Sequence, residues 1–151
     1  MVSVKKQNRF GQSLFELLVA VSVIGIALLA LANLVGNAIS ANTYAKNRTL
    51  AISYTQEALE WLRGERDKSW PQFLAQSSLN PGRLWCINEL NWGSSGSCGG
   101  STIDGSIFTR TVTLTRHDLL RIEVTVVTTW TDGSGTHDTR TVMVYSDWKT
   151  H

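Results

Sequence analysis

Hydrophobic residues fill the chain almost without interruption from Leu14 to Ala32, where the only polar side chains are those of Glu16 and Ser22. A run of this length approaches the roughly 20 residues that a helix needs to cross the hydrocarbon core of a bilayer. A carboxylate inside such a segment costs about 2.5 to 3.5 kcal/mol, so Glu16 needs a specific reason to be there. The pattern predicts a membrane-spanning helix with one acidic residue near its start.

The helical pattern continues beyond Asn33, while polar residues become more frequent. Gly36 weakens the helix and allows a local bend or a melted turn. Further on, apolar residues recur at helical spacing and predict one buried stripe. The stripe consists of Ile52, Leu59 and Leu62, with Ala45, Ala51, Ala58 and Tyr44. The helix is expected to end between Gly64 and Ser69.

Loop signals dominate residues 70–106, whereas apolar residues alternate with threonine and other polar residues over 108–145. Alternation with a period of two, interrupted by glycine turns, predicts an antiparallel meander of three strands with one buried face. The expected inward residues are Phe108, Val112 and Leu114, then Ile122, Val124, Val126 and Trp130, and finally Val142 and Val144. This face is expected to pack on the apolar stripe, which gives an α+β fold with a long N-terminal helix and a small antiparallel sheet.

A short basic segment precedes the hydrophobic run and ends in a glycine. Its basic residues are Lys5, Lys6 and Arg9. Gly11 follows them, and Glu16 lies five residues beyond Gly11. These residues resemble the prepilin leader of type IV pilins and pseudopilins, which is cut after a glycine and followed by an apolar helix with an early glutamate. The resemblance implies that a prepilin peptidase cleaves between Gly11 and Gln12 and methylates the new amine. It also implies a pilin-like architecture, with the first half of the helix embedded in the membrane.

Two positions depart from the family pattern. Gln12 stands where phenylalanine is usual, although minor pilins often vary there, and Asn33 stands where major pilins often carry a helix-kinking proline. A weaker similarity to minor pilins and minor pseudopilins covers Val124 to Val144, where a V-x-V-x-x-x-W pattern precedes Asp-Gly and a further strand.

Cleavage after Gly11 would explain how Glu16 is stabilised at the start of an apolar helix. The Gln12 amine would become a cation at the start of the helix, and Glu16 would lie in the first turn, where the helix dipole favours negative charge. A cation on a neighbouring subunit can offset a buried carboxylate, and such a pair fixes the register between subunits. The alternatives are a plain signal-anchor helix with an incidental glutamate and a conventional secretory signal cleaved near Ala38-Ile39-Ser40.

The length and net charge of the chain limit its expected partners and domain organisation. The chain of 151 residues has a formal charge of +2, but three of its 14 Lys and Arg residues lie in the leader, which leaves eleven against 12 acidic residues. No basic excess indicates a nucleic acid partner. The leader charge suits retention on the cytoplasmic side of a membrane. The expected organisation is a leader over residues 1–11, a membrane or filament-core half-helix over 12–36, and a globular domain over 37–151.

Cys86 and Cys98 lie in a polar, glycine-rich stretch. In a domain exported by the preceding helix, a disulfide is the default expectation, and two unpaired thiols are the alternative. Their spacing does not suit a zinc site, which would need further Cys or His ligands nearby.

Candidate catalytic groups are sparse. The pairs His117-Asp118 and His137-Asp138 invite a metal or acid–base role, but the meander would place them roughly 40 Å apart at opposite ends of its second strand. We recognise no catalytic serine arrangement and no phosphate-binding glycine loop, so we expect neither an enzyme nor a metal or cofactor. Trp85 and Trp92 leave open a binding module at a filament tip.

The resemblance implies a structural role. The expected function is that of a minor pilin, which primes the assembly of a type IV pilus or lies at its tip. A minor pseudopilin of a type II secretion system and a tip-located adhesin are the alternatives. The expected partners are other minor and major pilins, the prepilin peptidase, the inner-membrane assembly platform and membrane lipid. The expected location is the inner membrane, with an exported C-terminal domain, and the filament after assembly.

Overall fold

Helix α1 (Phe10–Lys68) is the first element of the structure, a computed structural model that describes residues 10–147. The chain forms two compact units that meet between Thr43 and Tyr44, and α1 contributes to both. The residues of α1 are helical throughout, including Gly36, so the melted turn that the sequence allowed there does not form. A glycine costs a helix only about 1 kcal/mol relative to alanine, which is too little to break a helix of this length.

The end of α1 at Lys68 confirms the predicted interval, and a short helix follows directly. Helix α2 (Trp70–Ala75) begins after Ser69, whose hydroxyl accepts a hydrogen bond from the N–H of Gln72 at 3.4 Å. Proline suits the first turn of a helix because its missing N–H would have no partner there. Trp70-Pro71 therefore starts a second helix as well as marking the end of the first.

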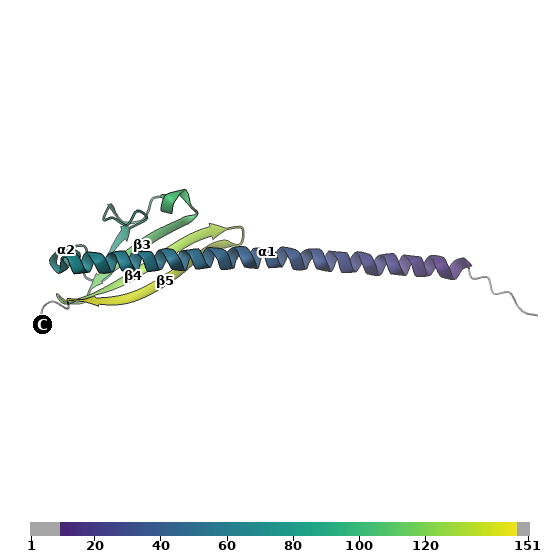
Figure 1. Cartoon of the computed structure of the whole chain (residues 1–151), viewed down its shortest axis with the longest axis horizontal. Helices are drawn as coiled ribbons and strands as arrows, with labels where there is room; N and C mark the ends of the chain where they lie inside the picture. Colours follow the sequence, from purple (N-terminus) through teal and green to yellow (C-terminus); the bar gives the residue numbers. More distant parts are fainter. Residues whose placement is uncertain (1–9, 148–151) are drawn as a thin grey trace, which may run out of the picture. The chain divides into compact units, whose positions relative to one another are not determined.

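The sheet has the strand order β2-β1-β3-β4-β5, and every neighbouring pair is antiparallel. Its elements are β1 (Arg83–Cys86), β2 (Ser94–Ser95), β3 (Phe108–Arg116), β4 (Arg121–Asp132) and β5 (Gly135–Ser146), with a 3₁₀ turn, η1 (Ile103–Gly105), before β3 (Figure 1). The three predicted strands are confirmed as β3, β4 and β5. The short strands β1 and β2 lie in the region that the sequence assigned to loops.

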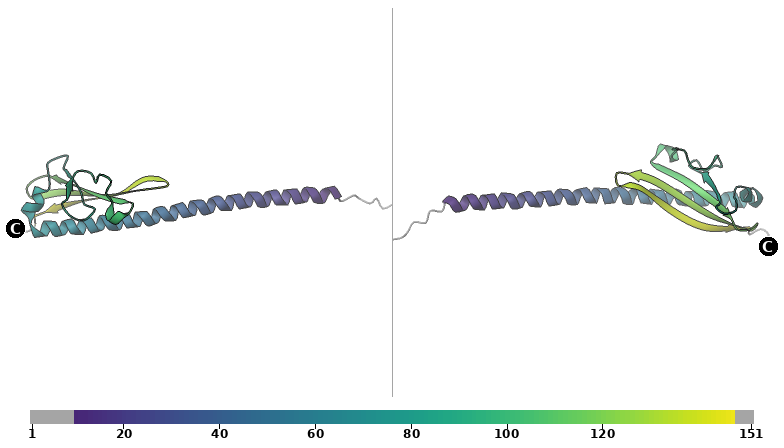
Figure 2. Two further views of the ribbon diagram at one scale, coloured as in Figure 1. Left: turned by 90° about the horizontal axis from the view of Figure 1, so that it is seen from above. Right: turned by 180° about the vertical axis from the view of Figure 1, so that it is seen from behind.

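The core of the second unit lies between the sheet and residues 44–68 of α1, along one side of that part of the helix (Figure 2). Its main cluster joins helix residues to inward residues of every long strand. The members are Ala58, Leu59, Leu62, Trp70, Phe73, Trp85, Ile87, Val112, Leu114, Ile122, Val124, Val126 and Tyr145. A second cluster consists of Ala51, Ile103, Phe108 and Trp130. The α+β fold predicted from the sequence is thus confirmed.

The face assigned to β5 was wrong. Val142 and Val144 are 48% and 59% exposed, whereas Tyr145 is buried and donates its hydroxyl proton to the carbonyl of Leu59 at 2.8 Å. Residues opposite each other in an antiparallel pair share one face of the sheet. Because Ile122 faces the helix and pairs with Tyr145, the odd-numbered residues of β5 face inward.

The predicted helical stripe also needs correction at its margin. Ala51, Ala58, Leu59 and Leu62 are buried as expected, but Ile52 is 38% exposed. Ala45 is exposed as well. The sheet covers a narrower arc of α1 than the sequence pattern allowed, and Ile52 lies at the border of that arc.

Candidate functional site

The apolar part of α1 carries the residues that the sequence singled out at the N-terminus. Gly11 and Gln12 lie in the first turn of α1, which begins at Phe10, and the side chains of residues 10–13 lie outside what the structure describes. This turn contains no acidic residue, so in the full chain Glu16 follows the first turn rather than lying in it. The predicted favourable position of Glu16 at the start of the helix therefore applies only to a chain that begins at Gln12.

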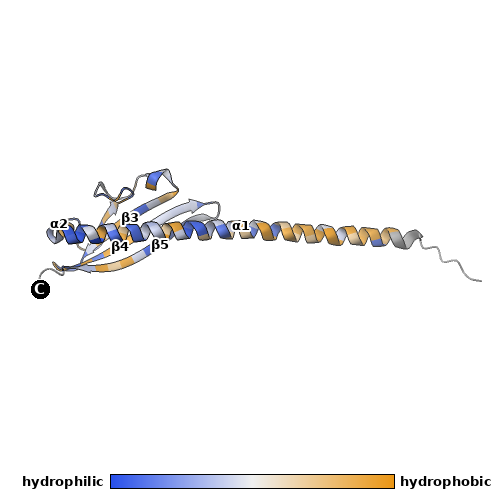
Figure 3. Ribbon diagram, viewed as in Figure 1, coloured by the Kyte–Doolittle hydropathy of each residue, from blue (hydrophilic) through white to orange (hydrophobic). Residues whose placement is uncertain are grey.

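The first unit presents an apolar surface on every side of the helix. Residues 14–43 are all exposed, and most of this stretch, from Leu14 to Ile39, is coloured as hydrophobic in Figure 3. The helix is long and apolar enough to cross a membrane. Ser22 satisfies its own hydroxyl by donating to the carbonyl of Leu18 at 2.7 Å. The carboxylate of Glu16 cannot donate to a carbonyl of its own helix in this way, because a carboxylate only accepts hydrogen bonds.

The second unit is stabilised by a disulfide between Cys86 and Cys98, as predicted. The loop that it closes is pinned to α1 by Trp92, whose indole N–H donates to Glu65 at 2.8 Å and whose ring lies 4.8 Å from that of Trp61. Burial acts to raise the pKa of Glu65, but hydrogen bonds from Lys68 and Trp92 outweigh it, so the pKa is lowered.

The tryptophans proposed as binding groups contribute to this packing. Trp85 is 9% exposed and donates its indole N–H to the carbonyl of Gln76 at 2.9 Å. The Trp85 ring also lies 5.5 Å from that of Trp92, which is itself half-buried. The two side chains hold loops together, which weakens the prediction that they form a ligand surface.

Arg110 is a buried charged residue that the sequence reasoning missed. Its side chain is 1% exposed and forms an ion pair with Glu57 at 2.8 Å. It also donates to the carbonyls of Tyr54 at 2.7 Å, Ile87 at 3.2 Å and Asn88 at 3.2 Å. One guanidinium group thus joins α1, β3 and the segment after β1. A signal was present in the sequence, since Arg110 occupies an inward position of β3 between Phe108 and Val112.

His117 and His137 belong to separate turns. His117 lies beside the β3–β4 turn and contacts Glu123 at 3.3 Å, whereas His137 lies near the β4–β5 turn, 3.2 Å from Asp132. Hydrogen bonds from the hydroxyl and N–H of Ser134, and then the proximity of His137, hold the pKa of Asp132 well below its usual range. Among residues 10–147, no three His, Cys, Asp or Glu side chains gather in a way that could hold a metal ion.

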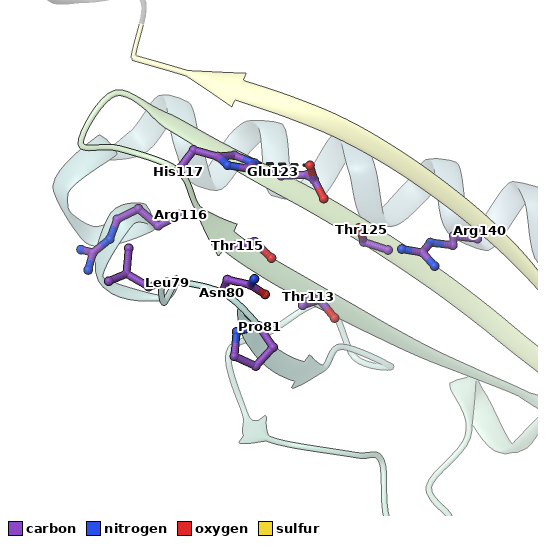
Figure 4. A pocket seen from close by; sticks show the side chains of 10 residues that line it. All are labelled: Leu79, Asn80, Pro81, Thr113, Thr115, Arg116, His117, Glu123, Thr125 and Arg140. Atoms are coloured by element: carbon purple, nitrogen blue, oxygen red, sulfur yellow. Dashed lines mark hydrogen bonds and ion pairs between the residues drawn. The ribbon is translucent and has the colours of Figure 1, made fainter.

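A polar hollow of about 610 Å³ lies on the outward face of the sheet (Figure 4). Thr113, Thr115 and Thr125 line its floor, and Arg140 extends its guanidinium toward Thr125. The segment before β1 forms one wall, because Ser78 accepts a hydrogen bond from the N–H of Arg116 at 2.8 Å. The hollow offers hydrogen-bond donors and acceptors to a polar surface.

Fold and site together define a class of protein. Its members have an apolar N-terminal helix with a single early carboxylate, followed by a small disulfide-bonded α+β head, here the second unit that begins at Tyr44. Residues 6–32 match the family model described as the prokaryotic N-terminal methylation motif. The match supports a relationship to the type IV pilin and pseudopilin family, because the chain carries the N-terminal motif of that family. Proteins of this family are structural subunits rather than enzymes. Comparisons with curated proteins and with solved structures found no match.

Proposed function

We propose that the chain is a minor pilin, a structural subunit that primes the assembly of a type IV pilus. The observation that carries this proposal is the position of Glu16, five residues beyond Gly11, within the matched methylation motif and near the start of the part of α1 that is exposed on all sides, residues 14–43. A prepilin peptidase would cleave between Gly11 and Gln12 and methylate the amine of Gln12. The subunit would then wait in the inner membrane with its C-terminal domain exported.

Assembly requires the apolar helix to exchange lipid for the helices of neighbouring pilins. Between Leu14 and Ala32, only Glu16 and Ser22 offer more than apolar contacts for this exchange. Glu16 would pair with the N-terminal amine of an adjacent major or minor pilin, because a carboxylate surrounded by apolar groups needs a nearby cation. The inner-membrane assembly platform would extract the subunit in this paired state. The disulfide of the head fits an exported domain.

Replacement of Glu16 tests the proposal directly. Glu16→Gln and Glu16→Ala should leave cleavage and membrane insertion intact, since neither depends on a partner subunit. Removing one partner of a buried ion pair costs about 3 to 5 kcal/mol, so incorporation into filaments should fall by roughly a hundredfold or more. The measurement is the ratio of filament-bound to membrane-bound chain on quantitative immunoblots.

Ser22→Ala is the matched control. Ser22 is the other polar side chain of the run, but its hydroxyl is already bonded within the helix to Leu18. This variant should enter filaments normally. Equal incorporation of the Glu16 variants and the control would contradict the proposed pairing. Loss of a pilus, rather than of protein secretion, on deletion of the gene would separate a pilin from a type II secretion pseudopilin.

A further inference from the structure

Strand β5 is the last strand of the sheet, and its outer edge is unpaired within residues 10–147. It pairs with β4 over its full length, from Asp132 opposite Gly135 to Arg121 opposite Ser146, without a bulge. An edge strand exposes a row of backbone N–H and C=O groups that another strand can bind. The length of this edge makes it a candidate interaction surface.

The hydrogen-bonding residues of this edge follow from the pairing. Gly133 and Ser134 form a two-residue turn, so the flanking pair Asp132–Gly135 exchanges hydrogen bonds and every second pair after it does the same. The odd-numbered residues of β5 therefore bond to β4. At the other end of the strand, the N–H of Asp147 donates to Leu120 at 3.1 Å, which agrees with this phase. The even-numbered residues direct their N–H and C=O groups outward.

The usual protection of an edge strand is weak here. Natural sheets prevent the pairing of an edge strand by placing lysine, proline, a bulge or an inward-pointing charge in that strand. From Thr139 to Tyr145, the only charged residue is Arg140, and no proline occurs. Val142 and Val144 are instead about half exposed on the outward face. This part of the edge combines free backbone groups with apolar side chains.

A second hollow, distinct from the polar hollow of Figure 4, lies between the inward face of β5 and α1. It has a volume of about 480 Å³ and is lined on β5 by the inward residues Thr139, Thr141 and Met143. On the other side it is lined by residues of α1, among them Ile52, which the sheet leaves 38% exposed. A further strand beside β5 would place its own inward side chains over this hollow.

We propose that β5 accepts an extended strand from another subunit of the same filament, which continues the sheet and covers Ile52. The residues Arg140, Val142 and Val144 would supply the backbone hydrogen bonds. The incoming strand would carry apolar residues beside the two valines and an acidic residue beside Arg140. The guanidinium of Arg140 has no hydrogen-bond or ion-pair partner among the described residues. The choice of partner rests on the proposed function, whereas the open edge is a property of the second unit alone.

Residue-resolved hydrogen–deuterium exchange tests this pairing even while the partner subunit is unidentified. The full chain is compared in purified filaments and as an isolated, detergent-solubilised protein. In filaments, the amides of Arg140, Val142 and Val144 should exchange roughly 100-fold more slowly, because each gains a hydrogen bond. Thr141 and Met143 should change little, since β4 already protects their amides.

The outcomes are distinct. Filaments that contain the chain but leave the even-numbered amides unprotected overturn this inference alone. Protection that appears in the isolated protein as its concentration rises also overturns it, because a second copy is then the occupant. Absence of the chain from filaments, scored beforehand on immunoblots, overturns the proposed function and this choice of partner together.

Val142→Pro tests the edge by mutation. Proline removes an outward N–H that β4 does not use, so the sheet should form while the incoming strand is hindered. Incorporation into filaments should fall by at least about tenfold, whereas Val142→Thr keeps the N–H and should stay within about twofold. Should Val142→Pro prove unfolded by circular dichroism, Val144→Lys at an exposed edge position replaces it. Normal incorporation of the folded edge variant overturns the proposal.

Discussion

Arg110 provides the sharpest test of how the head is held together. The substitution Arg110→Met keeps most of the apolar stem but removes all of the guanidinium donors. Tyr54 and Ile87 each retain another donor for their carbonyls, the first within α1 and the second from the N–H of Leu90 at 3.2 Å. Asn88 loses its donor at 3.2 Å, and among the described residues no other group donates to its carbonyl.

These differences set the expected magnitude. Leaving one buried carbonyl unsatisfied costs about 1 to 3 kcal/mol, and the lost charge-assisted bonds add about 1.5 kcal/mol or more. The ion pair with Glu57 adds little, because the Glu57 side chain is 53% exposed and solvent screens it. The free energy of unfolding should fall by roughly 3 kcal/mol. For a unit of this size, that corresponds to a Tm decrease of roughly 12 to 24 °C.

The assay is thermal unfolding of the full chain in detergent, followed by near-ultraviolet circular dichroism of the tryptophans. Glu57→Gln serves as the matched control and should shift the free energy of unfolding by less than about 1 kcal/mol. A buried ion pair can often be replaced by apolar residues without loss when both partners are replaced. Here the partners include backbone carbonyls that no substitution removes. An Arg110→Met variant as stable as the wild type would refute the reasoning.

Three further predictions concern the same head. Tyr145→Phe removes the hydrogen bond to Leu59 and should lower the free energy of unfolding by about 1 kcal/mol, read from urea titration; an unchanged midpoint would contradict it. Reduction of the Cys86–Cys98 disulfide should destabilise the head by roughly 3 kcal/mol in the chain-entropy model, measured by calorimetry with and without reductant, and identical transitions would argue against that model here. The lowered pKa of Asp132 means that its stabilising contribution is complete above its usual value of 3.8 and is lost as the pH falls below it. Asp132→Asn should therefore flatten the acid limb of the stability profile, and a parallel profile would exclude this role.

The sequence predicted those parts of the fold that depend on local patterns. The helix over the apolar run, the end of α1 and the strands β3 to β5 all follow from local sequence patterns, and each agrees with the structure. The pairing of Cys86 with Cys98 followed from the compartment that the helix implied, and it is confirmed. None of these features depends on the details of long-range contacts.

The face of β5 depended on a contact that composition alone does not reveal. Valines are more apolar than the threonines and the tyrosine that alternate with them, so the pattern favoured Val142 and Val144 as inward residues. The register with β4 decides otherwise, because Tyr145 pairs with Ile122. A two-residue turn at Gly133-Ser134 sets this register, because it places Asp132 opposite Gly135.

Arg110 and the short strands escaped prediction for a related reason. Arg110 interrupts an alternation of threonine and apolar residues, and its partners lie 22 to 56 residues away along the chain. Strands β1 and β2 contain four and two residues, which is too short for a periodic signal. These features depend on hydrogen bonds between residues that are distant in the sequence, and local sequence patterns do not reveal such bonds.

The N-terminus of the chain isolated from purified filaments tests the central claim most directly. Mass spectrometry should find a chain that begins at Gln12 with a methylated amine. Filament-bound chain that still begins at Met1, or that begins near Ala41, would contradict the account.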